Sequence, residues 1–286
     1  MTPTDACQNI AIILYCALVP AHLAALVLSL LLKRNFSRYL TIFMGLAMLA
    51  NLLAIVFRGI EVQHWPFQTL YEALLLVSLN LAIGYLLIYF SNGLYAEDRF
   101  TSLIANLLGL LVSSFAAFFI ILAASSDAYK ADLPPALQSV WFVPHVMVYI
   151  FGYGALIVAS CAAVIYLILG RAWGATPSAE ADLARLDSFV YICVAIGFPF
   201  LTMALIFGAL WAQVVWATYW GWDSKEVWSL ITWLVYLVYL HLRYIKGWRA
   251  ARSAWLVVLG AIAIFVTFLL SGYLPASQAS VHKYAG

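Results

Sequence analysis

Charged residues are scarce in this chain: Asp, Glu, Lys and Arg together make up 9% of 286 residues, whereas 66% are hydrophobic. A soluble protein of this size cannot bury so much apolar surface, so the composition excludes an ordinary soluble domain. No hydrophilic stretch is long enough for a separate soluble domain, and no convincing internal repeat is found. The sequence therefore predicts a single polytopic membrane domain over residues 1–286.

Paired cysteines and basic runs are also missing. The four cysteines form no CxxC motif and mostly lie inside apolar runs, at positions Cys7, Cys16, Cys161 and Cys193. Neither a disulfide framework nor a dithiol redox site is indicated by this pattern. The net charge is only +2 and no basic run suggests a nucleic-acid partner.

Long apolar runs, in contrast, are abundant. A helix of roughly 20 apolar residues crosses a hydrocarbon layer about 30 Å thick, and the alternating pattern of a membrane β-barrel is absent. The partner of most of this surface is therefore the lipid bilayer. We predict an all-α integral membrane protein with about eight transmembrane helices, over residues 9–32, 39–60, 67–90, 101–124, 141–169, 188–210, 226–245 and 254–274.

The distribution of Lys and Arg predicts the orientation, because these residues favour cytoplasmic loops. Ten of the fourteen fall in one set of predicted loops, and the other set holds only Arg58, Lys130, Lys225 and Lys283. Both termini are therefore expected on the external side, periplasmic or lumenal. The opening residues MTPTDACQ lack the basic start of a cleaved signal peptide, so we expect the first helix to stay in the mature protein.

Several of the few charges gather in one aromatic stretch, WATYWGWDSKEVW (216–228). The predicted orientation places it outside, between the sixth and seventh helices. Trp and Tyr collect at membrane interfaces in general, so a membrane anchor explains the tryptophans equally well. Asp223 stands three residues before Glu226, which is typical of the N-terminal cap of a helix, so its carboxylate is also explained by the start of the seventh helix.

Ionisable groups in membrane spans are costly and commonly functional, which makes the histidines candidates. His145 and His282 are both expected on the external side, where they flank the tryptophan-rich stretch. Neutral imidazole is a leading ligand of haem iron, and the flat macrocycle needs an aromatic wall. These two histidines are therefore candidate axial ligands.

The other three histidines differ in depth. His241 follows Glu226 by fifteen residues, or about 22 Å along the seventh helix, which places it in the inner part of the bilayer. His22 is explained equally well as a buried neutral imidazole bonded to a neighbouring carbonyl. For His64, a solvated position at the interface is an adequate explanation.

A family resemblance is carried by WAQVVWATYWGWDSKEVWSLITWLVYLVYLHLR (211–243), which resembles the signature of the WWD family of haem-handling membrane proteins in cytochrome c maturation. Three further segments are similar to the CcsA, or ResC, type within this family: HWPFQTLYEALLLVSL (64–79), HVMVYIFGYGAL (145–156) and VHKYAG (281–286). The resemblance extends from about residue 40 onward. Where the family usually has Gly, Pro, Asn and Ser, this chain has Ala217, Ser224, Gln213 and Lys283.

The resemblance implies a function. The chain is expected to be the haem-handling subunit of a two-component cytochrome c synthase, acting as an enzyme with a CcsB (ResB) membrane subunit. It would take part in haem export and hold haem b at an external WWD loop, here residues 211–226, for thioether attachment to the CxxCH cysteines of apocytochrome c. The implied location is a bacterial plasma membrane or a thylakoid membrane.

The resemblance also implies roles for individual residues. His145 and His282 correspond to the two external axial ligands of haem iron. His241 corresponds to a transmembrane ligand whose counterpart comes from the partner subunit. The loop residues that fall on the signature are Trp216, Trp220, Trp222 and Asp223.

Three other functions are compatible with parts of the pattern. A CcmC-like protein would deliver haem to a chaperone without ligating it, but the number of predicted spans and the LYEALLLVSL segment favour the synthase subunit. A membrane haem b electron carrier commonly has two histidines on one span, and no predicted span here carries two. A solute transporter is disfavoured because the ionisable residues gather at span ends.

Overall fold

The computed structural model describes residues 2–32, 34–91, 93–96, 99–126, 135–172, 177–249 and 251–271. Within these ranges the chain is helical and contains no strand. The α-helices are α1 (Pro3–Leu32), α2 (Ser37–Val62), α3 (Leu70–Ser91), α4 (Arg99–Ala124), α5 (Phe142–Ala172), α6 (Pro177–Trp216), α7 (Ser224–Ile245) and α8 (Ala251–Phe265). Two short elements complete them: the 3₁₀ turn η1 (Pro135–Gln138) and the π-helical turn η2 (Val266–Leu270).

Seven of these helices are long and apolar enough to cross a membrane, judged over the described residues. The eighth, α7, is 22 residues long and carries Lys225, Glu226 and Arg243. These helices confirm the prediction of an all-α integral membrane protein. The direction in which the termini face stays a prediction.

Two helices extend at least six residues beyond the spans that the apolar pattern predicted. α1 begins at Pro3, six residues before the expected start, and α6 extends over 40 residues from Pro177 to Trp216. The polar first turns of α6 are helical although they lack the apolar character that marks a membrane span. Pro199 lies inside α6, where it cannot donate the backbone hydrogen bond of a regular helix.

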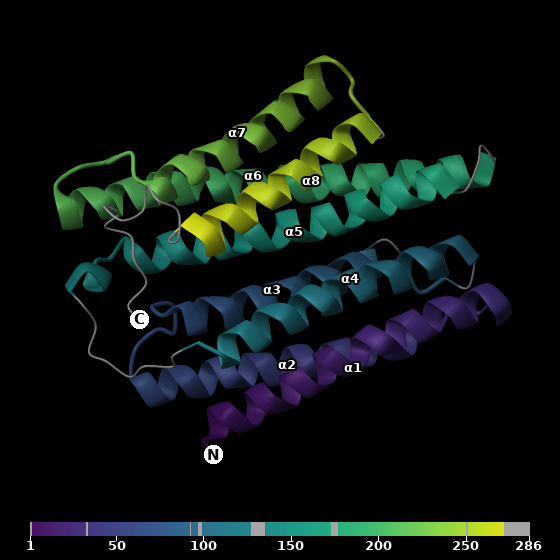
Figure 1. Cartoon of the computed structure of the whole chain (residues 1–286), viewed down its shortest axis with the longest axis horizontal. Coiled ribbons are helices and arrows are strands. Elements are labelled where there is room, and N and C mark those ends of the chain that lie inside the picture. The colour runs from purple at the N-terminus through teal and green to yellow at the C-terminus, as the bar shows by residue number, and fades with distance from the viewer. Residues whose placement is uncertain are drawn as a thin grey trace. The chain divides into compact units, whose positions relative to one another are not determined.

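The chain divides into two compact units. The first contains α1–α4 and the first residues of α6, and the second contains α5, the rest of α6, α7 and α8. In the first unit, α1 packs against α2 and α4, and α3 packs against the same two helices (Figure 1). The prediction that residues 1–286 form one membrane domain stays a prediction.

Hydrogen bonds between side chains and neighbouring helices join the elements of the second unit. The Trp233 indole N–H of α7 donates to the Thr202 hydroxyl of α6 over 3.0 Å. The Ser160 hydroxyl of α5 donates to a carbonyl of α8 over 3.2 Å. Thr232 of α7 and Thr267 of η2 are linked through their hydroxyls at 3.0 Å. Each helix of this unit is thus tied to another by polar groups as well as by apolar packing.

The buried face of α1 carries a polar residue at every seventh position. A spacing of seven returns to the same side of a helix, and the residues on this line are Gln8, Tyr15, His22 and Ser29. At one end the Tyr71 hydroxyl of α3 donates to Gln8 over 2.8 Å, and at the other the Ser102 hydroxyl of α4 donates to Ser29 over 2.9 Å. The interior of the first unit is therefore partly polar along its length.

A buried ion pair joins α2 to the start of α3. Arg58 Nε lies 2.9 Å from Glu72 Oε1, and the two side chains are only 2% and 0% exposed. Arg58 therefore does not belong with the external loop residues among which its sequence position placed it. Its charge is matched inside the protein by a carboxylate fourteen positions away.

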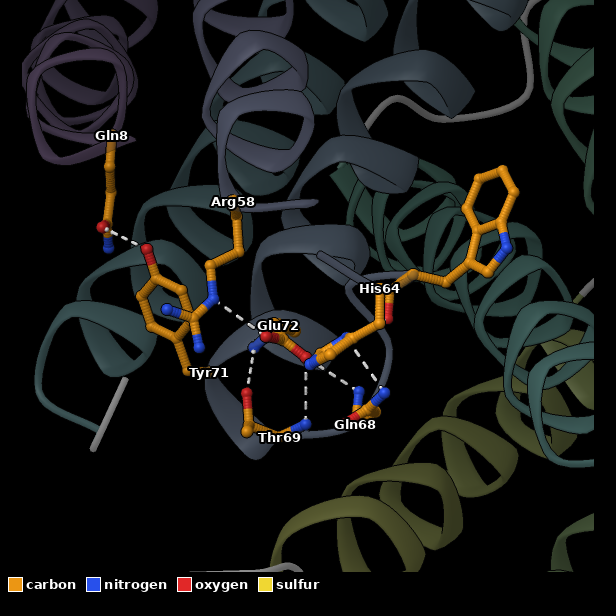
Figure 2. A network of polar contacts seen from close by, with 8 residues as sticks. Gln8, Arg58, His64, Gln68, Thr69, Tyr71 and Glu72 are labelled. Carbon is orange, nitrogen blue, oxygen red and sulfur yellow. Dashed lines mark hydrogen bonds and ion pairs between the residues drawn. The ribbon is translucent and has the colours of Figure 1, made fainter. Parts of the chain in front are cut away.

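The same carboxylate begins α3. The backbone N–H of Thr69 donates to Glu72 Oε2 over 3.2 Å, and the Glu72 N–H donates to the Thr69 hydroxyl over 3.2 Å. This reciprocal arrangement is a capping box. The Gln68 N–H adds a third bond to Glu72 at 2.8 Å. Figure 2 shows Glu72 at the centre of this network, between Arg58 and the turn that precedes α3.

Breaking this pair on one side should be costly. We expect Glu72→Gln to lower the free energy of unfolding by about 3 kcal/mol, because the buried Arg58 guanidinium then loses the carboxylate that lies 2.9 Å from its Nε. Glutamine at this position still suits a capping box, so the helix start is kept. Titration with dodecyl sulfate in detergent micelles measures the effect.

The matched control is the double variant Arg58→Met/Glu72→Gln, which removes both charges. It should recover most of the lost stability, because neither ion remains to be desolvated. If the double variant is as unstable as Glu72→Gln alone, the loss of stability in Glu72→Gln does not come from the unmatched charge of Arg58.

Candidate functional site

One face of α6, which includes two glycines and an alanine, packs against α5. The residues on this face follow each other at intervals of four and three, as one side of a helix requires, and we call them the α6 stripe: Gly197, Leu201, Ala204, Gly208 and Trp211. A Cβ atom added at Gly197 would lie 3.3 Å from the Gly152 carbonyl oxygen of α5, and the reverse distance is also 3.3 Å. The two backbones therefore approach closely at this crossing, as small residues allow between membrane helices.

His145 lies in the first turns of α5 and contacts the C-terminal part of this stripe. Its Nδ1 is 2.8 Å from the Ala204 carbonyl oxygen. A carbonyl only accepts, so Nδ1 carries the hydrogen and Nε2 carries the lone pair of the neutral ring. The ring lies directly against Gly208, where an added Cβ would come within 2.8 Å of Cε1.

Aromatic contacts lead from His145 to the predicted tryptophan-rich stretch. The Trp211 ring stacks on the imidazole with centroids 5.9 Å apart and planes at 23°. Trp211 also meets Trp216 edge-on at 4.9 Å, and its indole N–H donates to the Ala136 carbonyl over 2.8 Å. The structure therefore joins His145 and Trp216 through Trp211, a residue that was not among the predicted site residues.

Residues 217–223 form the non-helical connection between α6 and α7, so the predicted loop 211–226 also includes the end of one helix and the first turn of the next. Ala217 and Trp222 both have a φ of 57°, in the left-handed region. Trp220 and Trp222 meet edge-on with centroids 5.9 Å apart, and the Trp222 side chain is 71% exposed. Among the described residues, the buried indole N–H of Trp220 has no hydrogen-bond partner.

Asp223 is the N-cap of α7, as its spacing to Glu226 predicted. Its Oδ1 accepts the Glu226 N–H at 2.8 Å. Glu226 Oε2 in turn accepts the N–H groups of Asp223 at 3.3 Å and Gly221 at 2.8 Å. These bonds complete a capping box and fix the end of the aromatic connection, which gives Asp223 a structural role. A role of Asp223 in ligand binding stays a prediction.

His241 lies near the opposite end of α7, with an exposed side chain, and no described contact joins it to His145. Nearby, Arg243 donates to both carboxylate oxygens of Asp187 on α6, at 2.7 and 2.8 Å. Arg243 is therefore held by a partner within the protein.

The described histidines differ in how well they suit axial ligation of haem iron. His145 suits it, since the hydrogen bond at Nδ1 assigns the lone pair to Nε2 and an aromatic wall adjoins the ring. His282 lies outside the described residues. His22 is fully buried and its Nδ1 is 3.5 Å from the Asn106 amide oxygen, which agrees with a neutral core imidazole. His64 is half-buried at the α2–α3 turn, near Gln68.

Comparison with known proteins places this chain in a family. The model of the family described as cytochrome C assembly protein matches residues 67–277. The chain belongs to this family. Its CcsA-type relatives include that of Chlamydomonas reinhardtii, 36% identical over 229 residues, which are 80% of this chain and 64% of that protein. The relative from Guillardia theta is 34% identical over 251 residues, covering 79% of each chain.

A cyanobacterial member, CcsA of Prochlorococcus marinus, is 32% identical over 267 residues, 84% of this chain and 83% of that protein. These similarities confirm the resemblance to CcsA-type cytochrome c biogenesis proteins. Together with the apolar helices, they identify an integral protein of a thylakoid or plasma membrane. Among solved structures, the cytochrome c haem lyase CcmF shares the fold, with a TM-score of 0.72 and 20% identity over 97% of this chain and 49% of that chain.

The capping role of Asp223 is testable by two substitutions. We expect Asp223→Ala to lower the free energy of unfolding by about 1 kcal/mol, because the Glu226 N–H loses its acceptor. Asn caps a helix as well as Asp does, so Asp223→Asn should stay within about 0.3 kcal/mol of the parent. Equal losses in the two variants, measured by denaturant titration, would mean that the charge matters rather than the cap.

The left-handed backbone at Ala217 leads to a stabilising substitution. Ala217→Gly should raise the free energy of unfolding by about 1 kcal/mol, because glycine adopts this conformation without steric cost. Ala209→Gly is the control, since Ala209 is helical within α6, and the same change there should destabilise by about 1 kcal/mol. Thermal unfolding in detergent distinguishes the two, and a loss of stability at both positions would contradict the argument.

Proposed function

We propose that this chain is the haem-handling subunit of a cytochrome c synthase, which holds haem b at an external site beside the WWD loop for attachment to apocytochrome c. Membership of the cytochrome c assembly family supports a role in cytochrome c biogenesis and, with it, the handling of haem. The observation that carries the finer proposal is His145, whose Nδ1–H is held by the Ala204 carbonyl next to an aromatic wall.

In this proposal His145 and His282 are the external axial ligands. Trp216, Trp220 and Trp222 line the apolar face of the macrocycle, and the Trp220 indole N–H, buried without a described partner, is available to a polar group of the ligand. Asp223 acts by holding the connection in place through its cap.

His241 is the third ligand of the proposal, and it lies on the inner side of the membrane. Its exposed position on α7 supports a site completed from outside the chain. We assign the missing ligand to a CcsB-type membrane subunit. Haem entering from the cytoplasmic side would then be held first at His241 and later at the external site, which makes haem export part of the function.

Thioether formation adds the S–H of each CxxCH cysteine across a vinyl group of haem: a C–S bond and a C–H bond form, the vinyl double bond becomes a single bond, and there is no net oxidation or reduction. The macrocycle supplies the vinyl groups. The chain contributes position, because reactants held in a fixed geometry react far faster than free ones. The histidine of CxxCH replaces one external imidazole, which brings its cysteines to the WWD loop.

The proposal is tested by removing each external ligand. His145→Ala and His282→Ala, each expressed with the CcsB-type partner and an apocytochrome c, should lower the yield of holocytochrome by at least about tenfold, because haem affinity falls when a ligand is lost. Added imidazole should restore part of the yield by filling the vacated position.

The matched control is His64→Ala, which removes a half-buried histidine of the first unit and should leave the yield near that of the parent. Absorption spectra of the purified complexes report how much haem each variant retains. Normal holocytochrome accumulation in His145→Ala or His282→Ala without imidazole would refute the proposed external site.

A further inference from the structure

We propose that Gly208 is a positioning residue for the external ligand, and that together with the Ala204 carbonyl and Trp211 it fixes the orientation and donor strength of His145. This inference rests on the proposed function, because it concerns how a ligand of that site is held. The three residues, which we call the His145 cradle, follow each other at i, i+4 and i+7 on α6. Each acts on a different part of the imidazole.

The Ala204 carbonyl sets the tautomer. Its oxygen accepts the Nδ1–H at 2.8 Å, which leaves the lone pair on Nε2. A hydrogen bond at the remote ring nitrogen also makes the imidazole a stronger donor to a metal, a recognised way in which proteins tune metal sites. Because the acceptor belongs to the backbone, no substitution at residue 204 removes it directly.

Trp211 restricts the rotation of the ring. Its indole lies nearly parallel to the imidazole, at 23° and 5.9 Å, and is itself held by the Ala136 carbonyl at 2.8 Å. On α5, Tyr149 meets the imidazole edge-on at 5.4 Å. The ring is therefore confined by aromatic side chains from both helices.

Gly208 provides the space in which the ring lies. A Cβ at this position would be 2.8 Å from Cε1 and 2.9 Å from Nδ1 of His145, well inside van der Waals contact. Any side chain at residue 208 therefore pushes the imidazole away from α6 and lengthens the bond to Ala204. The absence of a side chain at this position is what permits the Nδ1–H bond.

A simpler explanation is that Gly208 serves only to bring α5 and α6 together, as Gly197 does. The chain offers a close control for this alternative. A Cβ at Gly197 would come within 2.8 Å of Leu156 Cγ, so Gly197→Ala crowds the same pair of helices to the same degree without touching a histidine. Comparison of the two alanine variants separates helix packing from ligand positioning.

The experiment uses the full chain purified with its CcsB-type partner, in the forms Gly208→Ala, Gly197→Ala and His145→Ala. Gly208→Ala should retain roughly tenfold less haem at the external site, and added imidazole should restore it. The haem that remains should have a higher reduction potential, because an imidazole without its Nδ1–H bond donates less to iron. Gly197→Ala should show neither imidazole rescue nor a change in potential, although both variants lose some thermal stability.

The outcomes distinguish the two proposals. If His145→Ala loses haem while Gly208→Ala matches Gly197→Ala in haem retention, imidazole response and potential, ligation by His145 stands and the positioning role of Gly208 is overturned. If His145→Ala itself keeps the parental haem spectrum, the proposed ligand is wrong and both proposals are overturned. Imidazole rescue and a raised potential confined to Gly208→Ala would support the cradle.

Discussion

Helices in a bilayer gain little by moving apolar side chains from lipid to protein, because the lipid tails are as apolar as leucine. What holds them is close backbone packing and the pairing of polar groups that lipid cannot solvate. This constraint accounts for the features that define both units. Arg58 and Glu72 neutralise each other in the first, Asp187 and Arg243 in the second, and glycines bring α5 and α6 together at Gly152 and Gly197.

The third helix of each unit begins with a capping box. α3 starts with the capping box of Thr69 and Glu72, and α7 with that of Asp223 and Glu226. In both, the residue that follows the preceding helix, Gln63 or Ala217, has left-handed backbone and begins an aromatic turn. A glutamate that accepts several backbone N–H groups of the turn holds it at a fixed angle to the helix. Rigid presentation of an aromatic turn is therefore a property of both units, and in the second unit the turn connects α6, whose Trp211 packs on His145, to α7, which carries His241.

How well the sequence predicts a structural feature depends on whether the residues that form the feature are close together in the chain. Apolar run length predicts the number and approximate bounds of the helices, and the spacing of Asp223 and Glu226 predicts the cap, because both signals are local. The partner of Arg58 is fourteen positions away on another helix, and no local pattern reveals it. The His145 cradle is harder still, since it consists of a backbone carbonyl and a missing side chain, neither of which is a recognisable functional residue. The spacing of Ala204, Gly208 and Trp211 places them on one face of a helix, but that spacing alone does not distinguish a ligand-positioning group from ordinary helix packing.

The length of α6 has a mechanical consequence. Asp187, which binds Arg243 of α7, and Trp211, which packs on His145, are about 36 Å apart along one helix, more than the thickness of the hydrocarbon layer. One helix thus reaches from the Arg243 end of α7 to the imidazole of His145. Pro199 interrupts its hydrogen-bond ladder between these two points, where the carbonyl of Ala195 loses its helical donor. α7 bridges this interruption, because it is bonded to α6 on both sides of Pro199, by Arg243 to Asp187 and by Trp233 to Thr202, and it therefore resists bending of α6 there.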